Sequence, residues 1–245
     1  SPKQYLPLFK EGSLFAMTVN RNKGLVDKLL VVGNSDNYAL SEEVLERNAV
    51  DYQHIIEATP RNTAAAIAFA ALAAEGDDLL LVTPSDHVIM GESSYSEAVA
   101  QALVKAAEGY IVTFGIQASR PETGYGYIEY VDDQVLSFRE KPNHDTAEDF
   151  LERGNFLWNS GMFCFRASVL LEELQRYEPQ VYAAAMEAWA HNVEGRLEES
   201  LSKCIPSISI DYAVMERSKK IRVVKTDFQW SDLGSFESLY DYYLQ

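Results

Sequence analysis

Short apolar segments of strand length alternate with helical segments through the first half of this chain, and this alternation limits the fold more than any other feature. Strands separated by helices of about 10 to 15 residues are typical of βαβ units and of a parallel sheet. The sequence therefore predicts an α/β fold with a mostly parallel, mixed sheet flanked by helices. The strands are predicted at Leu29–Val32, Gln53–Ala58, Leu79–Thr83 and Tyr110–Ile116, and the helices at Thr63–Glu75 and Ser94–Glu108.

The regular alternation of strands and helices does not continue in the second half of the chain. Residues 124–131 (GYGYIEYV) and 134–141 (QVLSFREK) are predicted to be neighbouring strands joined by the acidic turn Asp132-Asp133. One domain with an inserted smaller subregion fits this order best. The remaining predicted elements are helices at Ala147–Arg153, Val169–Arg176, Val181–Ala190, around Leu197 and at Gly234–Leu244, and a strand at Ile221–Lys225.

Composition excludes several classes of protein. The 245 residues carry a net charge of −16, which argues against a general affinity for nucleic acid or an anionic membrane. The longest strongly apolar run, Thr63–Ala74, is too short to span a bilayer, and the sequence shows no signal peptide. Cys164 and Cys204 have no CxxC spacing and are interpreted as reduced thiols of a cytoplasmic protein.

Polar residues follow the strand predicted at Leu79–Thr83. Pro84 ends the strand because it has no N–H, and Ser85, Asp86 and His87 come next. In open parallel sheets, ligands bind outside the carboxyl ends of the strands, where Asp86 is predicted to lie. The alternative is that Ser85 or Asp86 only caps a turn.

A second carboxylate stands in a similar position. Asp232, in WSDLGSF, follows the predicted strand Ile221–Lys225 and precedes the last predicted helix, where it could also be only an N-cap. Mg²⁺ typically takes one or two carboxylates plus substrate phosphates, so Asp86 and Asp232 together favour a magnesium site. His87 is interpreted as an orienting or structural residue rather than as a ligand.

Three further segments suit a phosphorylated sugar. Glu140 and Lys141 end a predicted strand, where a lysine can meet a phosphate and a carboxylate can accept hydrogen bonds from vicinal hydroxyls. Gly126 removes a Cβ where a ligand could approach, and Asn159 offers both a donor and an acceptor. The alternatives are an exposed charged strand end and a glycine that marks a β-bulge.

The start of the alanine-rich helix suits a nucleotide. Asn62 or Thr63 can cap this helix, and its first N–H groups are available to an anion or to the polar edge of a purine. Arg61 adds positive charge beside them. No G-x-G-x-x-G opens a helix in this chain, which argues against a nicotinamide oxidoreductase.

These segments, in this order, resemble a known family. PKQYLPLF, RNTAAAI, TPSDHVI, TGYGYIE, SFREKP, NSGMF, SIDYAVME and WSDLGSF are similar to the sugar-phosphate nucleotidyltransferases, and in particular to their mannose-1-phosphate guanylyltransferase branch. The resemblance covers nearly the whole chain and implies a Rossmann-like nucleotidyltransferase fold that uses Mg²⁺. It implies metal ligands at Asp86 and Asp232, phosphate contacts from Lys141 and Lys3, mannose contacts from Gly126, Glu140 and Asn159, and nucleotide contacts from Asn62 and Thr63, with Arg61 and Ser85 beside them.

The chain also departs from that family. Its relatives begin with a strand and a glycine-rich loop, G-x-G-x-R-L-W-P-L, just before the PKQ segment, and many continue into a β-helix or an isomerase domain. Residues 1–245 are therefore expected to be a nucleotidyltransferase domain without its first strand and loop, and without any isomerase activity. A strand missing from the centre of the sheet would leave amides unpaired at about 1–3 kcal/mol each, so we expect the natural polypeptide to be longer.

The resemblance implies transfer of GMP from GTP to α-D-mannose 1-phosphate, giving GDP-mannose and pyrophosphate. Such a sugar phosphate is mostly ionised at neutral pH, so no general base is needed and none is evident in the sequence. The alternatives are another hexose 1-phosphate or base, and a non-catalytic paralogue that binds sugar nucleotides. Formation of a homo-oligomer is left open.

Overall fold

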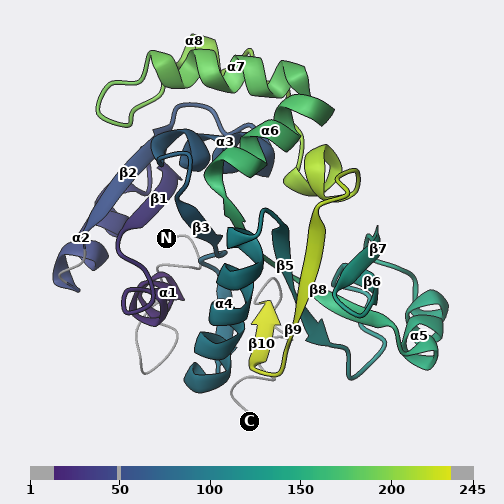
Figure 1. The fold of residues 1–245 in the computed structure, drawn as a ribbon. Helices are drawn as coiled ribbons and strands as arrows, with labels where there is room; N and C mark the ends of the chain where they lie inside the picture. Colours follow the sequence, from purple (N-terminus) through teal and green to yellow (C-terminus); the bar gives the residue numbers. More distant parts are fainter. Residues whose placement is uncertain (1–13, 49–50, 233–245) are drawn as a thin grey trace.

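A computed structural model describes residues 14–48 and 51–232 of the chain. Strands and helices alternate along it (Figure 1). The helices are α1 (Leu14–Asn22), α2 (Tyr38–Arg47), α3 (Asn62–Ala73), α4 (Glu92–Ala107), α5 (His144–Arg153), α6 (Ala167–Tyr177), α7 (Pro179–Ala190), α8 (Glu199–Ser202) and a π-helix (Asp211–Met215). The strands are β1 (Leu29–Asn34), β2 (Tyr52–Glu57), β3 (Leu79–Val82), β4 (His87–Met90), β5 (Ile111–Gln117), β6 (Tyr127–Val131), β7 (Gln134–Arg139), β8 (Phe156–Arg166), β9 (Ile221–Thr226) and β10 (Gln229–Asp232).

Six of the described strands form a central mixed sheet in the order β3-β8-β5-β9-β7-β6. β8 lies between β3 and β5 and runs antiparallel to both, whereas β5 and β9 are parallel. The predicted α/β class with a mixed sheet is thus confirmed. The prediction of mostly parallel pairing is corrected, because β8 separates two strands that run in the same direction. Apart from β5–β9, the parallel ladder among the described residues is β1–β2, a separate two-stranded sheet.

β8 is the longest described strand and was not predicted from the sequence. Asn159-Ser160-Gly161 divides the otherwise apolar sequence of β8 into two short runs, so the sequence pattern does not indicate one continuous strand. Ser160 is buried nevertheless, and its hydroxyl donates to the Phe114 carbonyl on β5 at 2.6 Å. Gly161 has φ +74°, a left-handed conformation that glycine adopts without strain. The register with β5 shifts at this point, because Thr113 is opposite Phe163 and Gly115 is opposite Asn159. Gly161 therefore allows the strand to bulge between its two paired stretches.

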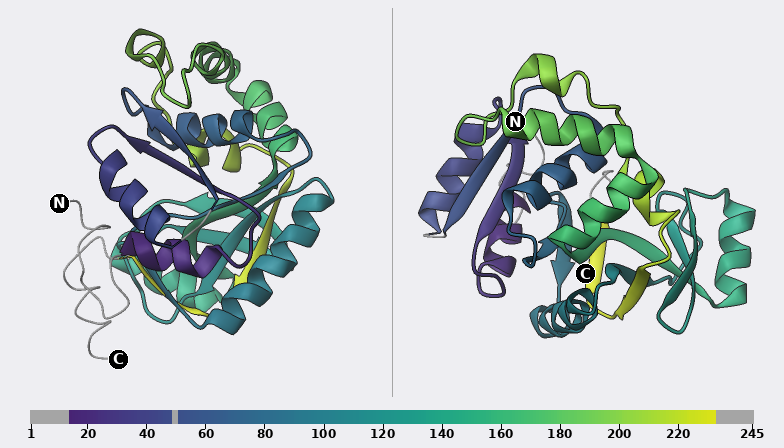
Figure 2. Two further views of the ribbon diagram at one scale, coloured as in Figure 1. Left: turned by 90° about the vertical axis from the view of Figure 1, so that its left-hand side faces the viewer. Right: turned by 45° about the horizontal axis from the view of Figure 1, so that its top comes forward.

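Helices cover both faces of the sheet (Figure 2). One core cluster joins α3, α6, α7 and the π-helix to residues of one sheet face, such as Phe163 and Phe165. A second cluster joins α4 and α5 to Cys164, Phe114 and other residues of the opposite face. α3 is almost entirely apolar and is buried on most sides, which explains why its sequence lacks the stripe of a surface helix.

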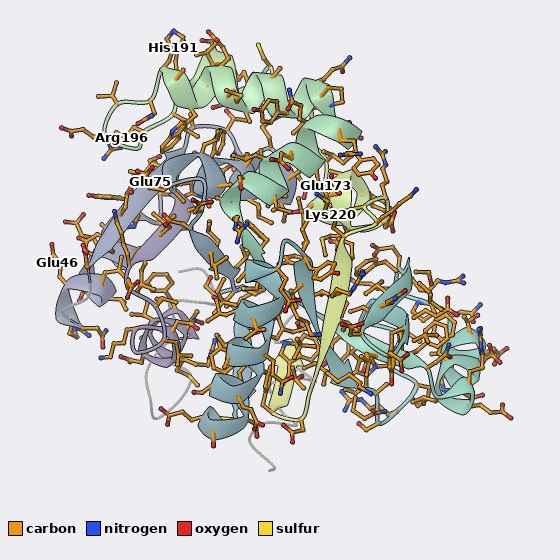
Figure 3. All side chains as sticks on the ribbon, in the orientation of Figure 1. Glu46, Glu75, Glu173, His191, Arg196 and Lys220 are labelled. Atoms are coloured by element: carbon orange, nitrogen blue, oxygen red, sulfur yellow. The ribbon has the colours of Figure 1, made fainter. Side chains whose placement is uncertain are left out.

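The loop between α7 and α8 covers the edge of β2. The Ile56 N–H donates to the Gly195 carbonyl at 2.8 Å, and the Leu197 N–H donates to the Ile56 carbonyl at 3.0 Å. Arg196, labelled beside β2 in Figure 3, places its guanidinium over the Tyr38 ring. This loop therefore continues the β1–β2 ladder on its far side and ties the α7–α8 region to it.

Buried polar contacts also join α6 to the start of β9. Glu173, on the inner side of α6, accepts a hydrogen bond from the Ser218 hydroxyl, which in turn accepts from the Lys220 N–H. Glu173 and Lys220 lie near one another in Figure 3. These contacts fix the chain just after the π-helix.

Most sequence predictions agree with the structure within one or two residues. The strands at β1, β2, β3, β5 and β9, the β6–β7 hairpin with its Asp132-Asp133 turn, and the helices α3 to α7 are confirmed. The fourth late helix, α8, begins after Leu197 rather than around it, and α1, α2, β4 and β10 were not predicted. The helix predicted at Gly234–Leu244 lies outside the described residues. The first strand and glycine-rich loop expected before the PKQ segment stay a prediction.

Two general expectations concern the described part of the chain. Cys164, which is buried, and Cys204, which is exposed, are both free thiols, as predicted. Among residues 14–48 and 51–232, no helix combines the length and the hydropathy needed to cross a bilayer.

Gly195 provides a test of how the loop is attached. A Cβ at Gly195 (φ +84°) would lie 2.2 Å from the His54 carbonyl oxygen, whereas a Cβ at Gly109 (φ +99°) meets no atom within 4 Å. Gly109→Ala should lower the free energy of unfolding by about 1–2 kcal/mol through its backbone conformation alone. Gly195→Ala should lower it by about 3 kcal/mol or more in urea unfolding, because the backbone must also move. Equal losses for the two variants would contradict this attachment.

Candidate functional site

The two predicted metal ligands lie at the same end of a pair of neighbouring strands. Asp86 is in the turn that joins β3 to β4, and β4 pairs antiparallel with β10, with His87 opposite Asp232. Opposed residues of an antiparallel pair have Cα atoms about 4.5 to 5.5 Å apart. The backbones of Asp86 and Asp232 are therefore close. Asp232 ends a strand, and the helix predicted to follow it lies outside the described residues.

His87 contacts both sides of this strand pair. Its Nδ1 accepts a hydrogen bond from the Trp230 indole N–H at 3.3 Å, and its Nε2 lies 3.6 Å from an Asp86 carboxylate oxygen. Because Nδ1 is an acceptor, the neutral ring carries its proton on Nε2, facing Asp86. The geometry agrees with the interpretation of His87 as an orienting residue.

A series of aromatic contacts connects this turn to the Gly124–Gly126 segment, which precedes β6. The Trp230 ring packs edge-on against His87 and also against Tyr125, with ring centroids 5.4 and 4.7 Å apart. Tyr125 stands between Gly124 and Gly126 and contacts Trp158 of β8 at 5.1 Å. Such edge-to-face pairs fix ring orientation as well as burying apolar surface. The carboxylate turn and the predicted sugar segment are thus held by one packed group.

The three residues predicted to contact the sugar converge. The Asn159 N–H donates to the Gly126 carbonyl at 2.8 Å. A Cβ at Gly126 would lie 3.4 Å from the Arg139 carbonyl oxygen and 3.7 Å from the Asn159 Cβ, and Glu140 follows Arg139 directly. The structure therefore brings Gly126, Glu140 and Asn159 together where β6, β7 and β8 meet.

Gly161 brings this group to the carboxylate turn. A Cβ at Gly161 would lie 3.6 Å from a Pro84 side-chain atom and 3.9 Å from the His87 ring. The Asn-Ser-Gly segment of β8 therefore lies directly against the Pro84–His87 turn. The predicted sugar and metal residues occupy one continuous region.

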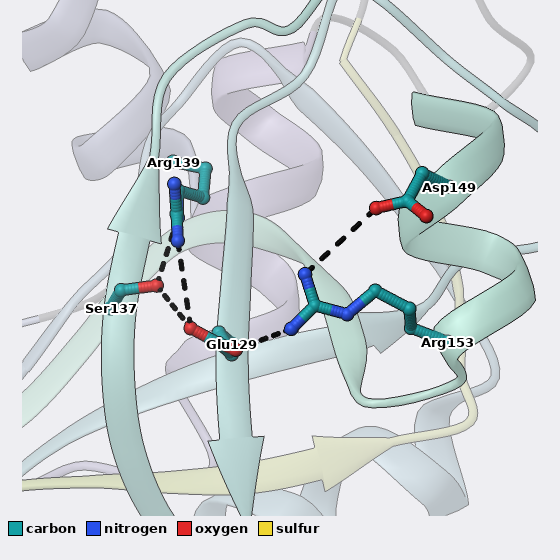
Figure 4. A network of polar contacts seen from close by, with 5 residues as sticks. All are labelled: Glu129, Ser137, Arg139, Asp149 and Arg153. Carbon is teal, nitrogen blue, oxygen red and sulfur yellow. Dashed lines mark hydrogen bonds and ion pairs between the residues drawn. The ribbon is translucent and has the colours of Figure 1, made fainter. Parts of the chain in front are cut away.

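Lys141 is exposed and follows the end of β7. Arg139, two positions before Lys141, belongs to a network that connects the hairpin to α5 (Figure 4). Arg139 donates to the Ser137 hydroxyl at 3.1 Å and lies 3.8 Å from Glu129, which also pairs with Arg153 at 3.1 Å. Because strand residues alternate between faces, this network orients the strand end from which Glu140 and Lys141 project.

The predicted nucleotide residues at the start of α3 are engaged by another segment. Arg61 donates to the Ile205 carbonyl at 2.7 Å, and the Thr63 hydroxyl accepts from the Ile210 N–H at 2.8 Å. Asn62 has φ +72°, and its side-chain oxygen accepts from the Thr63 N–H at 2.7 Å. These contacts give the three residues a structural role, and their nucleotide contacts stay a prediction, as does that of Ser85. Lys3 lies outside the described residues.

Asp211 is a residue of this region that sequence reasoning did not single out. Burial and the nearby Glu140 carboxylate raise its pKa, and a hydrogen bond from Asn159 partly opposes that rise. Its Oδ1 atom is buried and has no hydrogen-bond partner in the described chain. The sequence signals were a carboxylate within the apolar stretch SISIDYAVM and the place of this stretch among the segments that resemble the family.

Glu57, at the end of β2, is a second half-buried carboxyl group that the sequence did not indicate. Burial raises its pKa to about 7, although a hydrogen bond from the Arg61 backbone acts in the opposite direction. Its Oε2 atom is buried without a hydrogen-bond partner among the described residues. Glu57 therefore changes charge near neutral pH, close to the start of α3.

Comparison with known proteins identifies the family. The sequence matches the family described as "Nucleotidyl transferase" over residues 1–245. The chain belongs to this family. It is 43% identical to the xanthan biosynthesis protein XanB of Xanthomonas campestris, across 98% of the chain and 54% of that protein. It is 41% identical to the mannose-1-phosphate guanylyltransferase of Sinorhizobium fredii, across 97% of the chain and 50% of that protein.

A solved structure supports the same assignment of fold. The chain superimposes on the crystal structure of a protein named mannose-6-phosphate isomerase from Helicobacter pylori with a TM-score of 0.88. The two are 38% identical, and the match covers 94% of each chain. The nucleotidyltransferase fold implied by the sequence resemblance is therefore confirmed. The chain spans about half the length of the curated relatives it matches.

The Glu57 carboxyl group predicts a pH-dependent stability. Its pKa rises from 4.5 in the unfolded chain to about 7 in the folded protein, so ionisation of Glu57 disfavours folding. The cost is absent below pH 4.5, grows between pH 4.5 and 7, and is constant above that range. Glu57→Gln should therefore stabilise the protein by about 1–3 kcal/mol at pH 8, and by little at pH 4.5.

Urea unfolding at several pH values measures this difference. Glu75→Gln, which changes an exposed glutamate just after α3, is the matched control and should show no comparable gain. A gain for Glu57→Gln that is equal at pH 4.5 and pH 8 would show that the folded protein does not disfavour the charge.

Proposed function

We propose that this protein transfers GMP from GTP to α-D-mannose 1-phosphate, giving GDP-mannose and pyrophosphate. The observation that carries the proposal is the continuity of two groups of residues. β4 and β10 place Asp232 opposite His87, the residue that follows Asp86, and Gly161 packs the Asn159 segment against the same turn. A similar protein of Sinorhizobium fredii is named mannose-1-phosphate guanylyltransferase, which supports the choice of base and hexose.

The donor set near Asp86 and Asp232 suits Mg²⁺. Both residues offer carboxylate oxygens, which a hard cation prefers, and two carboxylates leave coordination positions for phosphates. We propose that they hold Mg²⁺, which would neutralise charge on the reacting phosphates. His87, fixed by Trp230, orients Asp86. This region contrasts with His144, Asp145 and Glu148, an exposed group on α5 that no second observation connects to the chemistry.

Apart from binding the metal, the protein has to align the two substrates. The sugar phosphate is already an ionised nucleophile, so the protein has to bring two anions together and hold them in line. Lys141 meets the hexose phosphate in this proposal, and Glu140 accepts hydrogen bonds from hydroxyls of the ring. The net charge of −16 makes a local cation necessary to bring the two anions together.

The two free thiols and the proposed substrates, GTP and a sugar phosphate, favour a cytoplasmic protein.

Pyrophosphate release tests the proposal directly. The full-length protein is incubated with Mg²⁺ and GTP, and either mannose 1-phosphate or glucose 1-phosphate is added. Release with mannose 1-phosphate should be faster by at least about tenfold, since hydroxyl-specific sites reject analogues whose hydroxyls are misplaced. Equal release, or a preference for another nucleoside triphosphate, would shift the assignment to another sugar nucleotide.

The name of the Helicobacter pylori relative raises a second candidate, an aldose–ketose isomerase. Incubation of mannose 6-phosphate without nucleotide distinguishes it. Formation of the ketose phosphate by this protein, together with no pyrophosphate release in the first assay, would replace the transferase proposal.

Removal of either proposed metal ligand should abolish most of the turnover. Asp86→Asn and Asp232→Asn are each expected to lower kcat by at least ~100-fold, because charge stabilisation in such reactions is worth several kcal/mol. Asp145→Asn, in the exposed α5 group, is the control and should leave kcat unchanged. Circular dichroism checks that each variant is folded. Near-normal Mg²⁺-dependent activity of a folded Asp232→Asn variant would contradict the assignment.

Lys141→Met should impair use of the sugar phosphate more than use of GTP. Loss of a charged hydrogen bond of about 1.5–3 kcal/mol corresponds to roughly a 10- to 100-fold rise in KM for mannose 1-phosphate. Lys203→Met changes an exposed lysine that pairs with Glu199 on α8, and it serves as the control. If Lys141→Met raised mainly the KM for GTP, Lys141 would belong to the nucleotide part of the site, and the proposed sugar and nucleotide parts would have to be exchanged.

A further inference from the structure

The helix that carries Asp211 has an uncommon geometry. Residues Asp211–Met215 form a π-helix, in which the Glu216 N–H donates to the Asp211 carbonyl at 2.9 Å. Short π-helical turns are rare and are found frequently at functional sites. Ala213, Val214 and Met215 are buried in the core cluster, so the turn is held by packing from behind. Its first residue, Asp211, faces Glu140 and Asn159.

Asn159 has a defined orientation in this group. Its side-chain oxygen accepts the Gly161 N–H at 3.0 Å, so its amide nitrogen is the atom left to contact Asp211. The amide therefore donates to the Asp211 carboxylate. Asn159 thus already uses one acceptor position on its own strand and one N–H on Asp211, so fewer of its hydrogen-bonding groups remain for a ligand. Its predicted contact with mannose stays a prediction.

The Asp211 carboxylate is left with unused acceptor capacity. Its Oδ1 atom is buried and receives no hydrogen bond from the described residues, although a buried carboxylate oxygen without a donor is destabilising. Glu140 lies close enough to raise the Asp211 pKa, so two carboxyl groups face the same small region. A ligand that brings several hydroxyl donors to this region would satisfy both groups at once.

The backbone before Asp211 is fixed independently. The Ile210 N–H donates to the Thr63 hydroxyl at 2.8 Å, and the Ala64 N–H donates to the Ile208 carbonyl at 3.2 Å. These bonds attach residues 208–210 to the start of α3. The Asp211 carboxylate is therefore held in position before any ligand arrives, as specificity requires.

We propose that Asp211 accepts hydrogen bonds from ring hydroxyls of the hexose phosphate and determines which epimer is accepted, with Asn159 as its positioning residue. The inference rests on the proposed function, and adds a residue to its sugar site. Asp211 and Glu140 approach the hydroxyls from two separate elements, the π-helix and the end of β7. An epimer that moves one hydroxyl would leave at least one of these carboxylates without its donor.

The test compares Asp211→Asn with the matched control Glu216→Gln. Both remove one carboxylate near Glu140, but Glu216 is exposed and follows the π-helix. The full-length wild-type protein is first assayed with GTP and a panel of hexose 1-phosphates to define its preferred substrate. The ratio of kcat/KM for mannose 1-phosphate to that for glucose 1-phosphate is then measured for each variant, with the KM for GTP.

Asp211→Asn should lower this ratio by about 10- to 100-fold and leave the KM for GTP within about twofold. Glu216→Gln should leave the ratio unchanged. Asp211→Asn should also raise the urea midpoint of unfolding at neutral pH, because it removes a charge that the folded protein disfavours. Protonation of Asp211 removes the same cost, so this gain should vanish as the pH falls towards the ordinary range of an aspartate. A purely structural Asp211 would instead give a lower midpoint.

An unchanged ratio for Asp211→Asn overturns the inference, whatever its stability. If Asp211→Asn does not fold, Asp211→Ser is measured in its place and the same ratio decides. A wild-type preference for another hexose contradicts the proposed function but leaves the Asp211 effect measurable as the loss of that preference. If the wild-type protein uses no hexose 1-phosphate, both proposals fail.

Discussion

The position of β8 between β3 and β5 is the constraint on which the rest of the structure depends. Phe163 is opposite Val82 on one side and Thr113 on the other, so both backbone edges of the strand are paired. Its side chains contribute to both core clusters, with Phe163 and Phe165 on one face and Cys164 on the other. The same strand carries Asn159 and Gly161 into the candidate site. A shift of β8 by one residue would exchange its two faces and would displace the site at the same time.

The sequence was sufficient where the signal is local. Leu79–Val82 is an apolar run followed by Pro84, and α3 is an alanine-rich run that begins at Asn62, so both elements could be located within two residues. β8 could not, because Asn159-Ser160-Gly161 interrupts its apolar run and only pairing with β5 and β6 makes it continuous. The antiparallel pairs that β8 forms were missed for the same reason.

The residues of the candidate site also fall into those that a local sequence pattern indicates and those that it does not. Residue types at strand ends indicated Asp86, Glu140 and Lys141, because polar residues at such positions are visible in the sequence. Their mutual arrangement depends on pairing between distant strands, such as β4 with β10, which no local pattern records. Asp211 and Glu57 were missed because their importance comes from burial. Burial raises the pKa of each carboxyl group, and this raised pKa reflects a cost that the two large core clusters offset.

The π-helix has a consequence for how this protein can vary. A π-helical turn holds one residue more than an α-helical turn of the same height, so it is equivalent to a single-residue insertion into an ordinary helix. Loss of one residue from this turn would restore an α-helix and rotate Asp211 by about 100° relative to the buried residues that follow it. Substitutions at Tyr212, which is exposed, should be accepted far more readily than any change in the length of this segment. Among natural variants of this chain, gaps and insertions should therefore avoid residues 211–215 and collect in the surface loops.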